Sequence, residues 1–344
     1  MNIHVFTKRV QEKENLSYDD MIQAVEIIFN EETPKEAIAE FLVALHEKGE
    51  TAEEIAALSI VMKSNAIHFP VTKGTYIDIC GTGGDGLKTF NISTTSAFVL
   101  ASSGVKVAKH GNRKISSSSG SADVLQALGI HTDFTVHESV QLLEQEGITF
   151  LYAPAVHPKL KRIGEVRRAI GKPTIFNLVG PLTNPVDLEV QLVGINRPDF
   201  VEEYAKVLSI LGRKRAIVIS GSQGMDEASL DHRNRSALLE NGEIKPFTIN
   251  IEELGLQPAS ISHLRGGTPE ENSEILKELL KGKRSPYYDA VVLNSALGFF
   301  AYGIAETLKE GVSMARDAIE SGRAYKKLEA VIEFSQNTIK EQAI

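Results

Sequence analysis

Residues 78–123 read DICGTGGDGLKTFNISTTSAFVLASSGVKVAKHGNRKISSSSGSAD, and this stretch decides the fold. The apolar run Tyr76–Cys80 leads into it and predicts a buried strand that ends at the glycine cluster 81–86. Residues 92–103 then predict a helix closed by Gly104. Strand, glycine loop and helix N-terminus together predict an anion site. Glycines let backbone N–H groups approach a ligand, and the helix dipole favours negative charge there.

The glycine loop resembles two nucleotide-binding motifs and fits neither. Gly81, Gly83 and Gly86 satisfy the G-x-G-x-x-G spacing of dinucleotide sites, which also requires an acidic residue about 20 positions later. The corresponding region, 105–110, is basic instead. A P-loop requires lysine directly after its last glycine, whereas this chain has Leu87. The register is therefore wrong for both kinds of nucleotide site.

The second half of the stretch adds cations and hydroxyl groups. It contains Lys106, Lys109, His110, Arg113 and Lys114, followed by Ser116–Ser119 and Ser121. Taken alone, this segment is equally typical of a serine-rich surface loop with solvated lysines. Next to the glycine loop it favours a ligand that carries several phosphates, because such a ligand requires amides, hydroxyls and cations together.

The motifs of this stretch resemble one family closely. GTGGDG at 81–86, the turn Asn91–Thr94, the segment Lys109–Arg113 and SGSAD at 119–123 are similar to those of the anthranilate phosphoribosyltransferases, and the likeness extends through essentially the whole chain. The resemblance implies transfer of a 5-phosphoribosyl group from phosphoribosyl pyrophosphate (PRPP) to the amine of anthranilate, in L-tryptophan biosynthesis. Ser119 stands where many members carry lysine.

The resemblance also implies a set of donor-binding residues from both halves of the stretch. They are Gly81, Gly84, Asp85, Thr89, Asn91, Ile92, Ser93, Thr94, Lys109, His110, Gly111, Asn112, Arg113, Lys114, Ile115, Ser116, Ser117 and Ser121. For anthranilate it implies Gly81, Asn112 and Arg167, with the arginine holding the carboxylate by a forked pair. A cationic helix face around Arg167 is otherwise typical of a solvated surface. Alignment favours Arg167 over Arg168.

Asp226 and Glu227 follow a glycine turn after a predicted strand. Adjacent carboxylates in such a loop are most often an exposed acidic turn, but Mg²⁺ also favours one or two carboxylates completed by water and phosphate. The resemblance implies two Mg²⁺ ions held by Asp226, Glu227 and Ser93. An aromatic amine is unprotonated at neutral pH, so no strong base is required. His110 is only a candidate for later proton removal.

Composition excludes several other classes of protein. The chain has 344 residues, a formal net charge of −8 and a single cysteine, Cys80. The acidic balance argues against binding to nucleic acid or an acidic membrane. The lone cysteine suits a reducing cytoplasm. Charged residues at 8–14 occupy the place of a signal peptide's apolar core, and no apolar run reaches about 18 residues. We therefore expect a cytoplasmic protein without nucleic-acid or membrane partners.

Two rival functions remain at this point. A pyrimidine nucleoside phosphorylase would share the fold and a phosphate-binding glycine loop, but the motifs, including the pair Asp226 and Glu227, are those of the PRPP enzyme. A non-catalytic nucleic-acid-binding relative would require a broadly basic surface, which the net charge disfavours.

Two domains are expected from the order of elements. Residues 1–70 predict a helical lobe with capping motifs at Ser17, Thr33 and Thr51, and the resemblance implies a homodimer formed through this lobe. Residues 75–344 predict an α/β domain with a mostly parallel sheet flanked by helices. The proline-rich segment 154–185 is a candidate to cross back to the helical lobe.

Within the α/β domain, alternating patterns place the remaining elements. Strands are predicted at 148–153, 192–195, 215–220 and 290–293, and helices at 121–128 and 198–211, with a helix capped at Thr135 and ended by Gly147. Asn241–Gly242 predicts a hairpin, hence an antiparallel sheet edge. Residues 294–298 are interpreted as scaffold.

Overall fold

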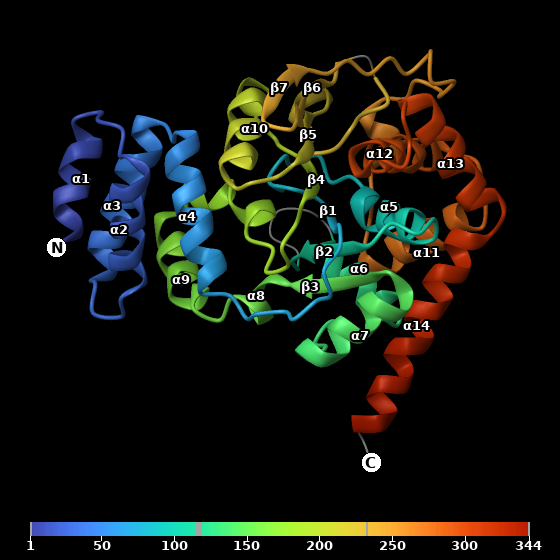
Figure 1. The fold of residues 1–344 in the computed structure, drawn as a ribbon, viewed down its shortest axis with the longest axis horizontal. Helices are drawn as coiled ribbons and strands as arrows, with labels where there is room; N and C mark the ends of the chain where they lie inside the picture. Colours follow the sequence, from blue (N-terminus) through green and yellow to red (C-terminus); the bar gives the residue numbers. More distant parts are fainter. Residues whose placement is uncertain (1, 114–118, 232, 343–344) are drawn as a thin grey trace.

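A small helical lobe lies beside a larger α/β part in the computed structural model, which describes residues 2–113, 119–231 and 233–342 (Figure 1). The lobe contains α1 (Ile3–Gln11), α2 (Tyr18–Phe29), α3 (Lys35–Lys48) and α4 (Ala52–Ser64). The Ser17 hydroxyl caps α2, and Thr51 forms a capping box with Glu54 at the start of α4. Two of the predicted helix starts are thus confirmed.

The capping box predicted at Thr33 is wrong. Pro34 is the N-cap of α3 and makes no side-chain capping bond. The Thr33 hydroxyl donates instead to the carbonyl of Ile27, in the preceding helix. The hydroxyl that the local pattern assigned to α3 therefore bonds to a residue six positions earlier in the chain.

The α/β part is built on one sheet of seven strands in the order β3-β2-β1-β4-β5-β6-β7, counted over the described residues. The strands are β1 (Ile77–Gly81), β2 (Val107–Gly111), β3 (Ile148–Tyr152), β4 (Val190–Gly194), β5 (Arg215–Ser220), β6 (Arg235–Glu240) and β7 (Glu243–Pro246). β1 to β5 are parallel, and β6 and β7 are antiparallel. Asn241 and Gly242 have positive φ angles of 50° and 85°, which confirms the predicted hairpin.

Helices cover both faces of this sheet (Figure 1). The helices that follow the lobe in the chain are α5 (Ile92–Ala101), α6 (Ser121–Ala127), α7 (Val136–Glu146), α8 (Ala153–Val156), α9 (Leu160–Ile170), α10 (Val201–Ile210), α11 (Pro269–Leu280), α12 (Pro286–Tyr302), α13 (Leu308–Glu320) and α14 (Arg323–Gln342). Ile79 and Ile217 face the core shared with α5 and α12, whereas Val193 and Val218 face the core shared with α10 and the helical lobe. Among the described helices, none is both long enough and apolar enough to cross a bilayer.

The strand predicted at 290–293 is wrong, because these residues lie inside α12. The side chains of α12 are buried nearly all round, so the helix carries no 3.6-residue alternation of apolar and polar positions. A short apolar run of this kind cannot be assigned to strand or helix from periodicity.

The segment after β3 packs on the helical lobe. Ile163 and Val166 of α9 belong to the same apolar core as the lobe, and Lys35 of α3 forms an ion pair with Glu165 at 2.7 Å. The chain then returns past Ile175 and Leu182, also in this core, to enter β4. This path places Arg167 where the two parts of the molecule meet.

Candidate active site

Glycines at the carboxyl ends of β1, β4 and β5 let an acidic loop approach the sheet. Gly81 and Gly194 are paired across β1 and β4, and Gly221 follows β5. A Cβ on Gly81 would stand 2.7 Å from the carbonyl oxygen of Asp226, and one on Gly194 would overlap that carbonyl. A Cβ on Gly221 would overlap the carbonyl of Glu227. Only glycine fits at these three positions.

The acidic loop is tied to the glycine loop and to the start of α5. Asp226 Oδ2 accepts a hydrogen bond from Gly83 N at 2.7 Å, and Glu227 Oε1 accepts one from Ser93 N at 2.9 Å. Ser93 lies in the first turn of α5, where backbone N–H groups have no partner within the helix. The two carboxylates line one pocket together with Ser93. The structure therefore brings together the three residues that were assigned to the metal.

The electrostatics of these buried carboxyl groups would favour a bound cation. Burial raises the pKa of the Asp226 carboxyl, and the nearby Asp85 carboxylate raises it further. Burial also raises the pKa of Glu227, with the Asp226 charge as the next cause. Lys109 is the nearby cation that opposes this for Glu227. Close carboxylates that raise each other's pKa are stabilised by any added positive charge.

The donor set suits magnesium with a phosphate ligand. Over the described residues, no group of three or more His, Cys, Asp and Glu side chains is placed to hold a metal ion by itself. Mg²⁺ typically takes one or two carboxylates and completes its octahedron with water and phosphate oxygens. Asp226 and Glu227 fit this requirement, with the Ser93 hydroxyl beside them.

Lys109 is buried at the centre of the site, with an exposed fraction of 2%. Its Nζ donates to the carbonyl of Ile79 at 2.6 Å and to the Ser93 hydroxyl at 3.1 Å. The ammonium group therefore joins β1, β2 and the start of α5. Lys109 also lines a second pocket, together with Gly111 and Ser121.

Asp78 supports the end of β2 and was missed as a site residue by the sequence analysis. Its carboxylate is fully buried and accepts hydrogen bonds from His110 N at 3.2 Å and from Asn184 Nδ2 at 3.0 Å. A signal did exist, because a charged residue inside the apolar run Tyr76–Cys80 requires a buried partner. Asn184 carried no such signal.

Asn91 is held by residues from distant parts of the chain. Its Oδ1 accepts from Asn272 Nδ2 at 2.9 Å, and its Nδ2 donates to the carbonyl of Ser119 at 3.3 Å. Thr89 forms an isolated antiparallel bridge with Arg265. These contacts fasten the glycine loop to the segment before α11.

The other predicted donor residues near the glycine loop differ in what they can offer. The side chains of Ile92 and Thr94 are buried, with exposed fractions of 0% and 1%, so only their backbone can meet a ligand. Asp85 Oδ1 accepts from Leu87 N at 3.0 Å and so shapes the loop. Gly84 has a φ angle of 81°, which other residues rarely adopt.

The turn after β2 is closed by Ser121. Its Oγ accepts from Asn112 N and donates to the Asn112 carbonyl, both at 3.1 Å, and a Cβ on Gly111 would collide with it. The Arg113 guanidinium lies 5.5 Å from the centre of the Tyr152 ring. The remaining predicted residues, Lys114, Ile115, Ser116 and Ser117, lie outside the described residues.

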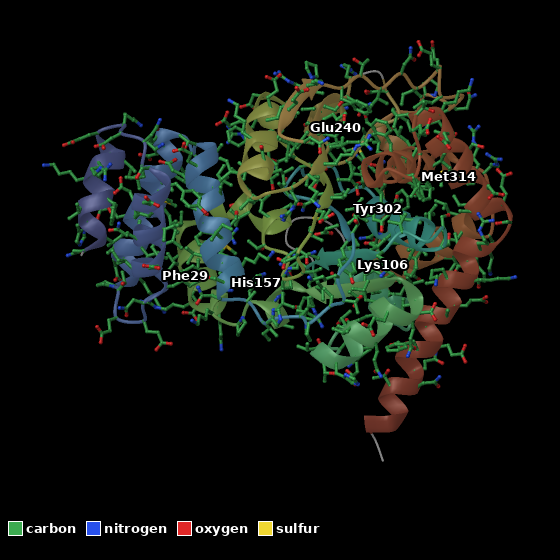
Figure 2. All side chains as sticks on the ribbon, viewed as in Figure 1. Phe29, Lys106, His157, Glu240, Tyr302 and Met314 are labelled. Atoms are coloured by element: carbon green, nitrogen blue, oxygen red, sulfur yellow. The ribbon has the colours of Figure 1, made fainter. Side chains whose placement is uncertain are left out.

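His110 is a buried, neutral imidazole. Its Nδ1 lies 3.1 Å from the carbonyl of Gly180, and a carbonyl only accepts, so Nδ1 carries the proton. Its Nε2 is buried and has no hydrogen-bond partner among the described residues. Burial, followed by the neighbouring His157, lowers the pKa of His110 to about 3. The two rings lie 5.4 Å apart, and Figure 2 shows His157 between the helical lobe, marked by Phe29, and the α/β part, marked by Lys106.

Arg167 lies in the last turn of α9 and is half-buried, whereas Arg168 is exposed. Its guanidinium stands 5.7 Å from the centre of the Phe176 ring and donates to Asn177 Oδ1 at 3.3 Å. Burial lowers its pKa, and the group stays cationic. The segment that contacts Arg167 continues to Gly180, which contacts His110, so one short stretch borders both residues.

Comparison with known proteins matches nearly the full length of the chain. Residues 73–325 match the glycosyl transferase family, a/b domain, and residues 5–66 match the glycosyl transferase family, helical bundle domain. The anthranilate phosphoribosyltransferase of Exiguobacterium sibiricum is 52% identical over 315 residues, which cover 92% of this chain and 93% of that protein.

Solved structures agree with this result. Anthranilate phosphoribosyltransferase from Thermus thermophilus superposes with a TM-score of 0.91 at 37% identity, covering 98% of this chain and 100% of that one. The Saccharomyces cerevisiae enzyme in complex with PRPP and Mg gives 0.89 at 28% identity, covering 97% and 98%. The same yeast enzyme in complex with 4-fluoroanthranilate gives 0.87 at 26%, covering 97% and 98%. The resemblance and the fold class predicted from the sequence are confirmed.

Proposed function

The chain belongs to the anthranilate phosphoribosyltransferases, and from this premise we propose which role each residue of the site has in the reaction of this family. The enzyme transfers the 5-phosphoribosyl group of PRPP to the amine of anthranilate, giving N-(5-phosphoribosyl)anthranilate and pyrophosphate in tryptophan biosynthesis. The observation that best supports this assignment is that Asp226 and Glu227 are hydrogen-bonded to the glycine loop and to the first turn of α5. Anion-binding amides and cation-binding carboxylates thus meet at one point.

The donor half of the site neutralises and orients PRPP. We assign the phosphates to the amides of the glycine loop, to the first turn of α5, to Lys109 and to the turn that follows β2. Helix N-termini and cations stabilise anions of this kind. Asp226, Glu227 and Ser93 would hold two Mg²⁺ ions, which supply Lewis-acid stabilisation of the departing pyrophosphate.

The acceptor half holds anthranilate beside the anomeric carbon. Arg167 pairs with the anthranilate carboxylate, and Asn112 and Gly81 border the amine. Positioning supplies a large share of the rate, because the two reactants are held at fixed distance and orientation. After the nitrogen has attacked, it carries a positive charge and loses its proton readily. The unprotonated Nε2 of His110 is a weak base, and it suffices for such an acid.

We also propose that the chain works as a cytoplasmic homodimer joined through the helical lobe. Val5 of α1 and Ile60 of α4 are exposed and supply apolar surface in this lobe. Analytical ultracentrifugation tests the assembly: a sedimentation coefficient of a monomer at micromolar concentration would refute it.

The test of the reaction is loss of anthranilate fluorescence on addition of PRPP and Mg²⁺. The double variant Asp226→Asn, Glu227→Gln should lose Mg²⁺-dependent turnover and remain folded, because it removes repelling charges from a buried site. Full activity of that variant would refute the metal assignment. Phosphate-dependent cleavage of thymidine or uridine would point to the phosphorylase reaction instead, and a gel shift at physiological salt would point to nucleic-acid binding.

A further inference from the structure

Asn294 forms two hydrogen bonds with the backbone of Ala228, the residue that follows Asp226 and Glu227. It lies in α12 and has an exposed fraction of 5%. Its Oδ1 accepts from Ala228 N at 3.0 Å, and its Nδ2 donates to the Ala228 carbonyl at 3.1 Å. The side-chain amide thus pairs with both backbone groups of one residue. A second donation from Nδ2, to the carbonyl of Ala290 at 2.9 Å, fixes the amide on its own helix.

The position of this contact connects it to the carboxylates. Ala228 follows Glu227 in the chain, and Asn294 lines the same cavity as Asp226 and Glu227. α12 packs against β4 and β5, the strands whose ends carry the acidic loop. The amide therefore fixes the backbone next to Asp226 and Glu227 relative to the buried helix α12.

The loop is restrained on both sides of Ala228. Before Ala228, the side chains of Asp226 and Glu227 accept hydrogen bonds from Gly83 N at 2.7 Å and from Ser93 N at 2.9 Å. Beyond Ala228 the chain is fastened again, since Asn234 Oδ1 accepts from Ser229 N at 2.9 Å and Asn234 Nδ2 donates to the Ser229 carbonyl at 2.9 Å. Asn234 belongs to the same loop, however, whereas Asn294 ties the backbone of this loop to a helix.

We propose that Asn294 is a positioning residue of the metal site, which holds residues 226–228 so that both carboxylates face that site. The inference rests on the proposed function, because that function assigns magnesium to Asp226 and Glu227. It revises the interpretation of residues 294–298 as scaffold alone.

The test measures Mn²⁺, a paramagnetic substitute for Mg²⁺, by electron paramagnetic resonance of the full chain with and without PRPP. The variants are Asn294→Ala and Asn294→Leu; the second nearly keeps the volume and adds no charge to the cavity, but loses both the acceptor for Ala228 N–H and the donor to the Ala228 carbonyl. The matched control is Ser295→Ala, since Ser295 is fully buried, lies next to Asn294 and has an Oγ without a hydrogen-bond partner among the described residues.

Both Asn294 variants should bind Mn²⁺ at least about 10-fold more weakly, which is the usual cost of removing an outer-shell partner of a metal ligand. Ser295→Ala should bind as the unmodified chain does. The activity of Asn294→Ala should recover in part at high Mg²⁺. Such recovery is expected if the variant binds the metal more weakly, and it is not expected if a catalytic group has been lost. Circular dichroism confirms that the variants are folded.

Unchanged Mn²⁺ affinity in a folded Asn294→Leu variant would overturn the inference alone, as would an equal loss in Ser295→Ala. Failure of the unmodified chain to bind Mn²⁺ in the presence of PRPP would remove the metal assignment of the proposed function, and this inference with it.

Discussion

Replacing Gly194 with alanine tests whether the acidic loop owes its position to the glycines at the strand ends. Gly194 is buried at the end of β4 and is paired with Gly81 of β1. A Cβ there would overlap the carbonyl carbon and oxygen of Asp226 and would reach 3.0 Å from Glu227 N. Ordinary van der Waals contacts of a Cβ begin at 3.4 Å, so the Asp226 carbonyl group has to move away from β4 by more than about 1 Å.

The expected result follows from that displacement. A shift of about 1 Å in a group that positions reactants can lower activity by roughly 100-fold, so kcat/KM for PRPP should fall by at least about this factor. Overpacking should also lower the free energy of unfolding by about 1–3 kcal/mol. The fluorescence assay for anthranilate at saturating Mg²⁺ measures the first effect, and urea unfolding measures the second.

Gly164→Ala is the matched control, because a Cβ on Gly164 in α9 has no heavy atom within 4 Å. Alanine inside a helix should raise the free energy of unfolding by about 0.5–1 kcal/mol and leave kcat/KM unchanged. If Gly194→Ala kept the kcat/KM of the unmodified chain, the close approach of the acidic loop to the strand ends would have no part in catalysis, and the reasoning would fail.

Three more expected outcomes concern the substrates and pH. Arg167→Ala should raise the KM for anthranilate by about 10- to 100-fold, because it removes a charge-assisted pair; initial rates check this, with the exposed Arg168→Ala as control. Lys109→Ala should weaken PRPP binding at least about 10-fold in a calorimetric titration, and equal affinity would contradict its role. Burial lowers the pKa of His110 to about 3 and of His157 to about 4, from 6.5. The contribution of these two rings to stability is therefore complete above pH 6.5 and declines as pH falls toward 4, by about 1.4 kcal/mol per pH unit for each ring. The raised pKa values of Asp226 and Glu227 act in the opposite direction over the same range, so urea unfolding is measured in the Asp226→Asn, Glu227→Gln variant. Stability of that variant that does not change between pH 7 and 5 would show both rings to be solvated.

Features decided within a few residues could be predicted from the sequence. The capping box at Thr135, the left-handed Gly147 that ends α7 and the hairpin at Asn241–Gly242 depend only on neighbouring residues, and all are present. The glycine loop and the start of α5 follow from the same kind of signal. These elements need no tertiary information, because turn and cap geometry is set by local backbone preference.

Features that depend on the surroundings of an element could not be predicted in this way. The hydroxyl of Thr33 donates to Ile27 O, six positions earlier in the chain, and not to the helix that follows it. Residues 290–293 look like a strand because α12 is surrounded by apolar neighbours, so its sequence loses the alternation that identifies a helix. In both cases the local pattern is compatible with more than one structure.

The same distinction applies to the site. Gly83 and Asp226 are 143 positions apart in the sequence, and only the family resemblance linked them before the fold was known. Gly194 and Asn272 carried no signal, and Asn294 was interpreted only as scaffold, because a glycine is informative only through what approaches it, and an amide only through what it pairs with. Supporting residues of a site are therefore the last to be found from sequence.

These supporting contacts share a property that bears on function. Asp226 and Glu227 are held by the backbone N–H groups of Gly83 and Ser93, and their loop is held by an amide side chain and by glycines, none of which carries a full charge. Lys109, the nearby cation, directs its hydrogen bonds to Ile79 O and to the Ser93 hydroxyl. The two carboxyl groups are thus fixed in place without an ion-pair partner at the hydrogen bonds that hold them. Their raised pKa values mean that burial disfavours the ionised form, so a ligand that brings positive charge to them favours ionisation and stabilises the folded chain. A site whose carboxyl groups are already held in place binds a cation with little reorganisation, which is the condition under which an electrostatic catalyst is most effective.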